Sequence, residues 1–174
     1  MSNNIEVIDN YLDFSQWQRI CTIIEKPRWS AKFLSPNNYL SRIWQWDHTE
    51  DQEEICSLLL EPYSQETGED YVMSHMYVNG QTMGMDSNPH TDRSYKTLVY
   101  FPMRHWLSTW GGHLMVWEGE RDKSEVHSIV PQPNRLIVID NKSGKFPWHF
   151  AQGPNTLSDK QLRISIGLHV ELKE

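Results

Sequence analysis

Apolar residues recur at three- and four-residue steps in the segment after Asp13, which predicts an amphipathic helix. The apolar positions are Phe14, Trp17, Ile20, Cys21 and Ile24. Asp13 has a side chain suited to a helix N-cap, and Pro27 follows the last apolar position. We therefore expect the helix to lie between these two residues.

A second helix is predicted by the capping-box pattern Thr49-Glu50-Asp51-Gln52. Ile55, Leu58 and Leu59 follow on one face, and we expect the helix to stop at Pro62. Between the two helices, residues 28–48 carry five aromatic side chains, Trp29, Phe33, Tyr39, Trp44 and Trp46. We expect this segment to form an irregular or extended cover in which the aromatic side chains serve packing more than ligand binding.

From residue 71 onward, short runs of β-favouring residues alternate with turn residues. The runs are 71–78, 95–101, 112–117, 125–130, 135–140 and 161–170. No helical pattern separates them, which favours a sandwich or an open barrel. The prediction is an α+β, mainly β, single domain over 1–174, with a helical N-terminal part over 1–70 and a β core over 71–174.

Composition excludes several classes of protein. The chain of 174 residues has a net charge of −7 and no basic block, which disfavours duplex nucleic acid as a partner. Its longest aliphatic run, 136–139, is far shorter than the roughly 20 residues that cross a bilayer, and the first residues lack the features of a signal peptide. Cys21 and Cys56 fall in predicted helices and form no disulfide framework, so we expect a cytoplasmic protein. The oligomeric state stays open.

Among eight histidines, three begin a His-x-Asp/Glu motif, His48-Thr49-Glu50, His90-Thr91-Asp92 and His169-Val170-Glu171. About one such match is expected by chance, so context must separate them. On a β-structure, residues i and i+2 point the same way, which places two metal ligands side by side. Only the His90-Thr91-Asp92 motif is followed by a distal histidine, His149, which in turn precedes a basic strand. Two imidazoles and one carboxylate are the facial ligand set of non-haem iron.

The basic strand reads Arg163-Ile164-Ser165-Ile166-Gly167, so Arg163, Ser165 and Gly167 share a face. A guanidinium offers a planar fork to a carboxylate, and the serine adds one more donor. A metal triad followed by such a clamp predicts a dicarboxylate co-substrate that chelates the metal at its other end. His169 lies on the same face by alternation. The other histidines, His48, His75, His105, His113 and His127, are expected to be structural or at the surface.

The ordered set His90-x-Asp92, His149 and Arg163-x-Ser165 resembles the Fe(II)- and 2-oxoglutarate-dependent dioxygenases, and among them the prolyl 4-hydroxylase-like branch. Further matching segments are Ile8-Asp9-Asn10-Tyr11-Leu12, Tyr77, Thr97-Leu98-Val99-Tyr100-Phe101, Trp110-Gly111-Gly112-x-Leu114 and Pro131-x-x-Asn134-Arg135-Leu136. The resemblance covers nearly the whole chain, most strongly residues 75–170. It implies a double-stranded β-helix, that is, a jelly-roll or cupin-like core.

The resemblance also implies the chemistry. Fe(II) would be held by His90, Asp92 and His149, and 2-oxoglutarate by Arg163 and Ser165. Two further contacts to the co-substrate are implied at Tyr77 and Leu114. O2 would be consumed and succinate and CO2 released as a C–H bond is hydroxylated, with ascorbate as an additional candidate cofactor.

Three residues depart from the branch pattern. Phe101 stands where many relatives have a second tyrosine that reaches 2-oxoglutarate, His113 where glutamate is frequent, and Gly167 where some relatives carry threonine. None of them belongs to the triad, so they bear on co-substrate affinity and on the substrate rather than on the class of reaction.

The substrate implied by the resemblance is a prolyl residue in a peptide or protein. We expect a mouth lined by Tyr95, Trp106 and Trp110, and a gating loop over residues 79–89 with Gly80 and Gly84 as hinges. Two cations near that mouth, Arg93 and Arg104, would suit a carboxylate, which leaves a free amino acid open, along with a small metabolite or a nucleotide.

Each motif also has a plainer structural interpretation. The His90 loop could be held by local hydrogen bonds, His149 could be packed among aromatic residues, and Arg163 could be an edge-strand charge. Tyr77 and Leu114 could simply belong to the core. A jelly-roll metal- or ligand-binding protein without O2 chemistry is the alternative from a different class, although such a protein has no need of the Arg163 clamp.

Overall fold

The computed structural model describes residues 4–34, 41–119, 121, 123–141, 147–155 and 162–173. In these ranges the chain forms ten strands, two α-helices and one 3-10 turn. The helices are α1 (Phe14–Ile24) and α2 (Gln52–Thr67), and the turn is η1 (Ser108–Trp110). The strands are β1 (Ile5–Ile8), β2 (Trp29–Leu34), β3 (Ser41–Trp46), β4 (Tyr71–Gln81), β5 (Lys96–Phe101), β6 (Leu114–Trp117), β7 (Val126–Ile129), β8 (Arg135–Asp140), β9 (His149–Ala151) and β10 (Arg163–Leu172).

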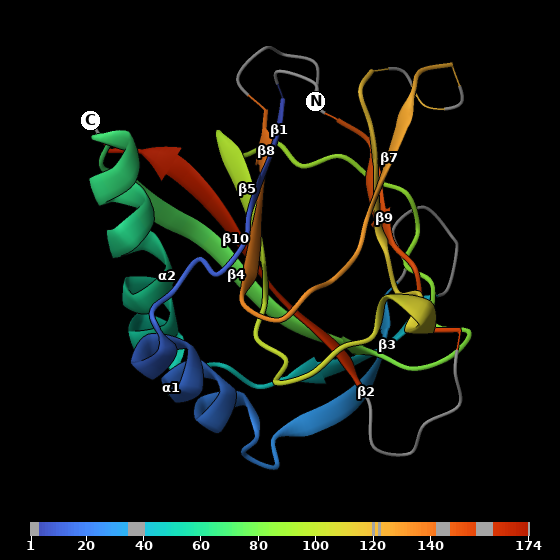
Figure 1. The fold of residues 1–174 in the computed structure, drawn as a ribbon, viewed down its shortest axis with the longest axis horizontal. Coiled ribbons are helices and arrows are strands. Elements are labelled where there is room, and N and C mark those ends of the chain that lie inside the picture. Colours follow the sequence, from blue (N-terminus) through green and yellow to red (C-terminus); the bar gives the residue numbers. More distant parts are fainter. Residues whose placement is uncertain are drawn as a thin grey trace.

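The strands form two antiparallel sheets that face one another as a jelly roll (Figure 1). The large sheet has seven strands in the order β1-β8-β5-β10-β4-β3-β2, and the small sheet has three in the order β7-β6-β9. Neighbours in the large sheet come from distant parts of the sequence, since β10 lies between β5 and β4. The predicted mainly β, jelly-roll fold with two N-terminal helices is confirmed.

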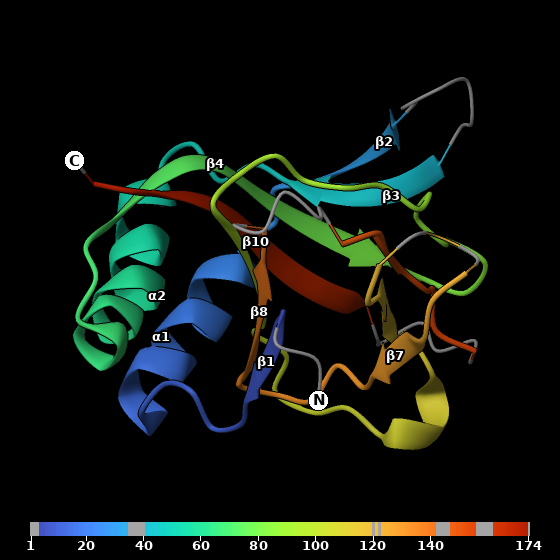
Figure 2. The ribbon, with the colours of Figure 1, turned by 90° about the horizontal axis from the view of Figure 1, so that it is seen from above.

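Both helices cover one face of the large sheet (Figure 2). The buried residues of this layer are Ile20, Ile23 and Ile24 of α1, Ile55, Leu59, Leu60 and Tyr63 of α2, and Met76, Val78, Leu98, Tyr100, Leu136, Val138, Ile166, Leu168 and Val170 of the sheet. The sheet residues alternate along their strands, as expected where one face of a strand meets helices.

The residues between them on the same strands point toward the small sheet. On β5 and β8 most of these inner positions are apolar, and Val99, Phe101, Ile137 and Ile139 join Leu114 and Val116 of β6 in a second core. On β4 and β10 the inner positions are mostly polar. The space between the sheets is therefore filled by apolar side chains at one end and left for polar side chains at the other.

The N-terminal part differs from the prediction in its strands and in the end of α2. Residues 1–70 also contain β1 and the hairpin β2–β3, so the aromatic segment expected as an irregular or extended cover is extended and belongs to the large sheet. Tyr39 of that segment lies outside the described residues. Helix α2 does not stop at Pro62 but continues to Thr67, where Gly68 ends it in the left-handed conformation with φ 68°.

Packing explains the continued helix, because Tyr63, directly after the proline, is buried against the sheet. Phe14, expected on the buried face of the first helix, is 71% exposed, since the core begins further along α1. No helix in the described part of the chain has the length and apolar character needed to span a membrane.

Candidate active site

Three candidate ligands come together where the loop after β4 meets the start of β9. The backbones of His90 and His149 form a reciprocal pair, with N–O distances of 3.0 and 2.9 Å. This pair brings residues almost sixty positions apart into register, and Asp92 follows two residues after His90. One ligand atom from each of the three side chains lies within 4.8 Å of the others, the spacing of a site that could hold a metal ion. The predicted grouping of His90, Asp92 and His149 is thus present in the structure.

Both imidazoles are oriented by their second nitrogen. His90 Nδ1 lies 2.8 Å from the carbonyl oxygen of Asn88, and His149 Nδ1 lies 3.1 Å from that of Pro147. A carbonyl oxygen accepts only from a protonated Nδ1, which leaves Nε2 with a free lone pair. Burial also lowers the pKa of His90, which favours the neutral ring that a metal requires. In the described residues the buried His149 Nε2 has no hydrogen-bond partner, so the donor set fits a bound cation.

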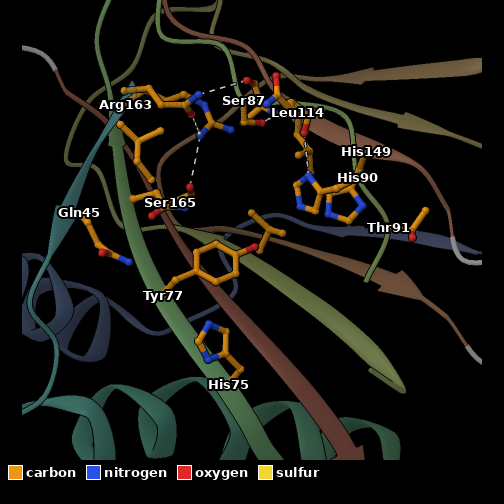
Figure 3. Close-up of a pocket in the computed structure, with 16 residues that line it drawn as sticks. Gln45, His75, Tyr77, Ser87, His90, Thr91, Leu114, His149, Arg163 and Ser165 are labelled. Carbon is orange, nitrogen blue, oxygen red and sulfur yellow. Dashed lines mark hydrogen bonds between the residues drawn. The ribbon is translucent and has the colours of Figure 1, made fainter. Parts of the chain in front are cut away.

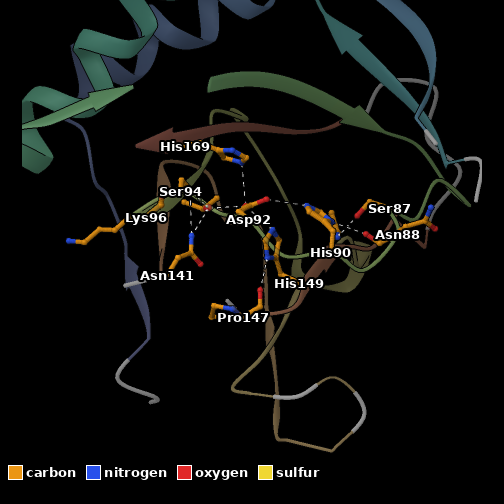
Figure 4. A network of polar contacts seen from close by, with 12 residues as sticks. Ser87, Asn88, His90, Asp92, Ser94, Lys96, Asn141, Pro147, His149 and His169 are labelled. Carbon is orange, nitrogen blue, oxygen red and sulfur yellow. Dashed lines mark hydrogen bonds and ion pairs between the residues drawn. The ribbon is translucent and has the colours of Figure 1, made fainter. Parts of the chain in front are cut away.

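Asp92 is the buried carboxylate of this group (Figure 4). Its Oδ2 accepts a hydrogen bond from Thr97 Oγ1 at 2.8 Å, and Thr97 in turn accepts one from Asn141 at 3.2 Å. His149 Nε2 and His169 Nε2 lie 3.2 and 3.3 Å from the same oxygen, although neither is aligned to donate to it. Burial alone would raise the pKa of Asp92, but the two imidazoles outweigh it and hold the pKa well below its ordinary value. The carboxylate is therefore ionised at neutral pH.

The histidine ligands line a cavity of about 630 Å³ between the sheets (Figure 3). Its walls are Ile43, Gln45, His75, Tyr77, Asn79, Gln81, Ser87, Asn88, His90, Thr91, Val99, Leu114, His149, Ala151, Arg163 and Ser165. The volume is that of a small-molecule site. Among these lining residues the only permanent charge is that of Arg163.

Arg163 is fully buried at the start of β10. Its Nε donates to the carbonyl oxygen of Gly112 at 2.6 Å, and its Nη1 donates to Gln81 Oε1 at 2.7 Å and Ser165 Oγ at 3.3 Å. The guanidinium also packs 5.1 Å from the ring centre of Phe101. These contacts fix the fork, but Nη2 has no hydrogen-bond partner in the described part of the chain.

Burial lowers the pKa of Arg163 to about 9, still high enough for a positive charge at pH 7. No carboxylate pairs with this cation among the described residues. A buried cation with one unused donor beside a cavity is suited to an anionic ligand, and a carboxylate matches the geometry of the fork. Arg163 and Ser165, predicted to act together, do lie side by side with the guanidinium donating to the Ser165 hydroxyl, and their role as a carboxylate clamp stays a prediction.

The turn Trp110-Gly111-Gly112 has a structural role next to this arginine. Gly112 has φ 73°, a conformation that side chains rarely adopt, and a Cβ there would lie 3.1 Å from Arg163 Cδ and 3.0 Å from the ring of Trp106. Glycine therefore allows the backbone close enough for its carbonyl oxygen to accept the Arg163 hydrogen bond.

Tyr77 and Leu114 line the cavity from the large and the small sheet respectively, and their predicted contacts to 2-oxoglutarate stay a prediction. Burial, with Asp92 as a second cause, raises the pKa of the Tyr77 hydroxyl, which stays protonated. Gly167 lies opposite Tyr77 on the neighbouring strand, and a Cβ at this position would be 2.0 Å from Tyr77 Cζ. The glycine that departs from the branch pattern thus makes room for the tyrosine ring.

Several lining residues were not expected. His75 was assigned to the structural or surface histidines, and Ile43 and Gln45 to the packing segment, yet all three line the cavity. The alternation of side chains along a strand could have identified His75, because it lies two residues before Tyr77 and so shares its face. No comparable signal existed for Ile43 and Gln45, since their strand was not predicted. His169 does lie on the inner face, beside Asp92.

The prediction that aromatic side chains line the mouth of the cavity is wrong. Trp106 is buried in the second core, where it donates to the Gly111 carbonyl oxygen, and Tyr95 packs against the helix layer. Neither these two nor Trp110 lines the cavity. The expected cations are absent from the lining as well, since Arg104 pairs with Glu25 of α1 and Arg93 is exposed.

The expected gating loop is tied down on one side. Gly80 lies inside β4, where Leu162 and Trp29 leave no space for a Cβ, so it is not a hinge. Ser87 exchanges two hydrogen bonds with Ala151 of β9, one through its backbone N–H and one through its hydroxyl. Gly84, with φ 77° and open space around it, remains the hinge candidate in this loop.

No protein-family model matches the chain, and no curated protein matches its sequence. Solved structures do match its fold. An oxidoreductase of the 2OG-Fe(II) oxygenase family from Burkholderia pseudomallei superposes with a TM-score of 0.72 at 11% identity, over 96% of this chain and 84% of that one. A prolyl hydroxylase from Trichoplax adhaerens, solved with a peptide fragment of the hypoxia inducible factor oxygen degradation domain, gives 0.67 at 18% identity, over 97% and 84%.

A third match is the non-heme alpha ketoglutarate dependent epimerase SnoN from nogalamycin biosynthesis. It gives a TM-score of 0.65 at 9% identity, over 95% of this chain and 76% of that one. Identities this low establish the architecture rather than the activity. The chain has the jelly-roll fold that these oxygenases share.

Proposed function

We propose that the protein is an Fe(II)- and 2-oxoglutarate-dependent dioxygenase. The observation that carries the proposal is the presence of two unsatisfied groups in one cavity. His149 Nε2, in a triad suited to iron, and Arg163 Nη2, in a fork suited to a carboxylate, are both buried without a hydrogen-bond partner in the described residues. A dicarboxylate that joins a metal to the arginine would satisfy both.

His90, Asp92 and His149 would hold the iron and leave its remaining positions open toward the cavity. Bound ferrous iron would supply the redox chemistry that couples O2 and the decarboxylation of 2-oxoglutarate to hydroxylation of a C–H bond.

The protein's own contribution is positioning and charge. The carbonyl oxygens of Asn88 and Pro147 keep both imidazoles in the tautomer that can bind a cation. Arg163 would neutralise the far carboxylate of 2-oxoglutarate in a buried site, while Ser165 and Gln81 hold the guanidinium in place. Leu114 and Val99 would limit the access of water to the co-substrate.

For the substrate, we propose a prolyl residue in a peptide or protein. Support comes from the branch resemblance and from the structural neighbour whose description names a bound peptide. The lining around the triad is also neutral, with Gln45, Asn79 and Asn88 as amide groups that can pair with peptide N–H and C=O groups.

A free amino acid or other small molecule is the second candidate. Among the described residues no aromatic pocket for a proline ring opens onto the cavity, and the same fold occurs in SnoN, an epimerase from nogalamycin biosynthesis.

The test begins with anaerobic addition of Fe(II) and 2-oxoglutarate to the metal-free protein. We expect a weak visible charge-transfer band that is lost in His149→Ala and retained in His127→Ala, a control histidine that pairs with Glu118 outside the cavity. Succinate release is then measured with prolyl-peptide, amino-acid and oligonucleotide pools, and mass spectrometry checks for a gain of one oxygen.

Metal binding without the band or succinate would favour the binding protein without O2 chemistry. Stimulation by the amino-acid pool alone would refute the peptide assignment and leave the reaction class intact.

A further inference from the structure

We propose that His169 is a positioning residue that fixes the carboxylate of Asp92 through its Oδ2 atom, so that Oδ1 remains available for the metal. The proposal rests on the metal site of the proposed function. His169 is not itself a member of the triad, because only His90, Asp92 and His149 among the described residues bring their ligand atoms within 4.8 Å of one another.

The sheet places two side chains on one carboxylate oxygen. His169 of β10 is the direct cross-strand partner of Thr97 of β5, so both side chains project from adjacent strands on the inner face. Thr97 Oγ1 donates to Asp92 Oδ2 at 2.8 Å, and His169 Nε2 lies 3.3 Å from the same oxygen (Figure 4). His149 Nε2 approaches this oxygen as well, at 3.2 Å, from the side of the triad.

The other oxygen is left open. Asp92 Oδ1 lies 3.9 Å from His90 Nε2, the nitrogen that the Asn88 carbonyl oxygen leaves unprotonated. A carboxylate that binds a metal through one oxygen is held by hydrogen bonds on the other, and such outer partners commonly set the orientation of the ligand.

The contact of His169 with Asp92 is not expected to stabilise the fold of the metal-free protein. Its buried Nε2 approaches Asp92 Oδ2 to 3.3 Å, but in the metal-free protein, among the described residues, this approach does not have the alignment of a hydrogen bond. A buried polar atom in that state costs free energy, so an apolar replacement of similar shape is expected to be neutral or stabilising for the metal-free protein. A role in metal binding and a role in folding therefore predict different results.

His75 provides a matched control. It is the cross-strand partner of His169 on the other side, on β4, and its ring centre lies 5.6 Å from that of His169. It is exposed, and among the described residues its side chain makes no hydrogen bond or ion pair with Asp92, so it is a neighbour of His169 without the position at the carboxylate.

The experiment titrates Mn(II), a redox-stable substitute for ferrous iron, into metal-free protein by calorimetry. Wild type is compared with His169→Phe, His169→Gln and His75→Phe, and urea unfolding with a chelator gives the stability of each. We expect His169→Phe to bind Mn(II) about 10- to 100-fold more weakly while its metal-free stability is unchanged or higher. His169→Gln, which keeps an N–H near the position of Nε2, should bind within about threefold of wild type, and His75→Phe should match wild type.

Equal Mn(II) affinity in His169→Phe and wild type would overturn the inference and leave the proposed function standing. A parallel loss of stability and affinity in His169→Phe, without rescue by His169→Gln, would assign the residue to folding and overturn it as well. Failure of wild type to bind any Mn(II) would overturn the metal site and this inference together.

Discussion

Replacing Gly167 with alanine tests how Tyr77 is held in the cavity. The new Cβ would lie 2.0 Å from Tyr77 Cζ and 2.3 Å from both its Cε2 and its hydroxyl oxygen. Carbon atoms in contact stay about 3.5–4.0 Å apart, so the ring must move by more than about 1.5 Å. The ring is rigid and turns as a unit about its side-chain bonds, which means that it must leave its present place rather than adjust within it.

Overpacking of this kind costs about 1–3 kcal/mol in stability. We expect Gly167→Ala to lose stability in this range in urea unfolding. It should also raise the apparent KM for 2-oxoglutarate, because the displaced Tyr77 ring lines the same cavity as Arg163. The decisive measurement is a double-mutant cycle. In a Tyr77→Ala background the alanine at position 167 should cost almost nothing, which gives a coupling energy close to the whole cost of the single substitution.

Additive effects of the two substitutions would refute this reasoning. They would mean that the backbone of β10, rather than the tyrosine ring, absorbs the added methyl group.

Three further predictions follow from single side chains. Arg163→Ala should weaken the binding of 2-oxoglutarate by roughly 2–5 kcal/mol, or tens- to thousands-fold, with little change in metal affinity. Arg163→Lys should not restore this binding, because a point charge cannot replace the fork. An unchanged binding constant for 2-oxoglutarate in Arg163→Ala would show that Arg163 does not hold the co-substrate. His149→Ala should abolish high-affinity metal binding in a protein that still unfolds cooperatively, and full-affinity binding would remove this residue from the site. The hydrogen bonds and ion pairs of Asp51 with Lys26 and Arg28 lower the pKa of Asp51. The ionised carboxylate therefore stabilises the fold above pH 3.8, its ordinary pKa, and this contribution is lost as the pH falls through the lowered pKa. In acid titration, Asp51→Asn should lose stability less steeply than wild type, and an equal slope would contradict this prediction.

The parts of the structure that could be predicted depend on local rules. Asp13 caps α1 with the full capping box, since its side chain accepts from the Gln16 N–H and the Gln16 side chain accepts from the Asp13 N–H. The triad and the clamp follow from alternation on strands and from the order of motifs along the chain. The cap and the i, i+2 spacings need only neighbours in sequence, whereas the meeting of His90 with His149, almost sixty positions on, is indicated only by the order of the motifs.

Other parts depend on contacts that no local pattern contains. The hairpin β2–β3 pairs with β4 through only two residue pairs, and its cavity residues Ile43 and Gln45 face inward only because of that pairing. Trp106 seemed a candidate for substrate contact, but the second core buries it. An aromatic side chain on a loop can turn inward or outward, and only the space left by the two sheets decides which.

Strand β4 shows how one extra residue changes the face on which side chains lie. Its pairing with β10 shifts between His169 and Val170, so that His169 faces His75 while Val170 faces Met73. Ser74 is the additional residue of this β-bulge. Regular pairing of all three residues would place Met73 and His75 on the same face, but because Ser74 is left out of the ladder, Met73 packs with the helix layer and His75 lines the cavity.

Deleting Ser74 should therefore be tolerated, because Met73 then pairs with Val170 directly beside the pair of His75 and His169, and both faces of β4 are kept. The deletion loses the hydrogen bond from Ser74 Oγ to the His169 carbonyl oxygen, worth about 0.5–1.5 kcal/mol at most. Ser74→Ala is the control, because it keeps the bulge and loses only that hydrogen bond. Urea unfolding measures both, and we expect the two variants to agree in stability within about 1 kcal/mol. A deletion variant that is less stable than the alanine variant by about 3–6 kcal/mol, the loss expected if Tyr71 and Met73 left the helix layer, would refute this assignment of the bulge.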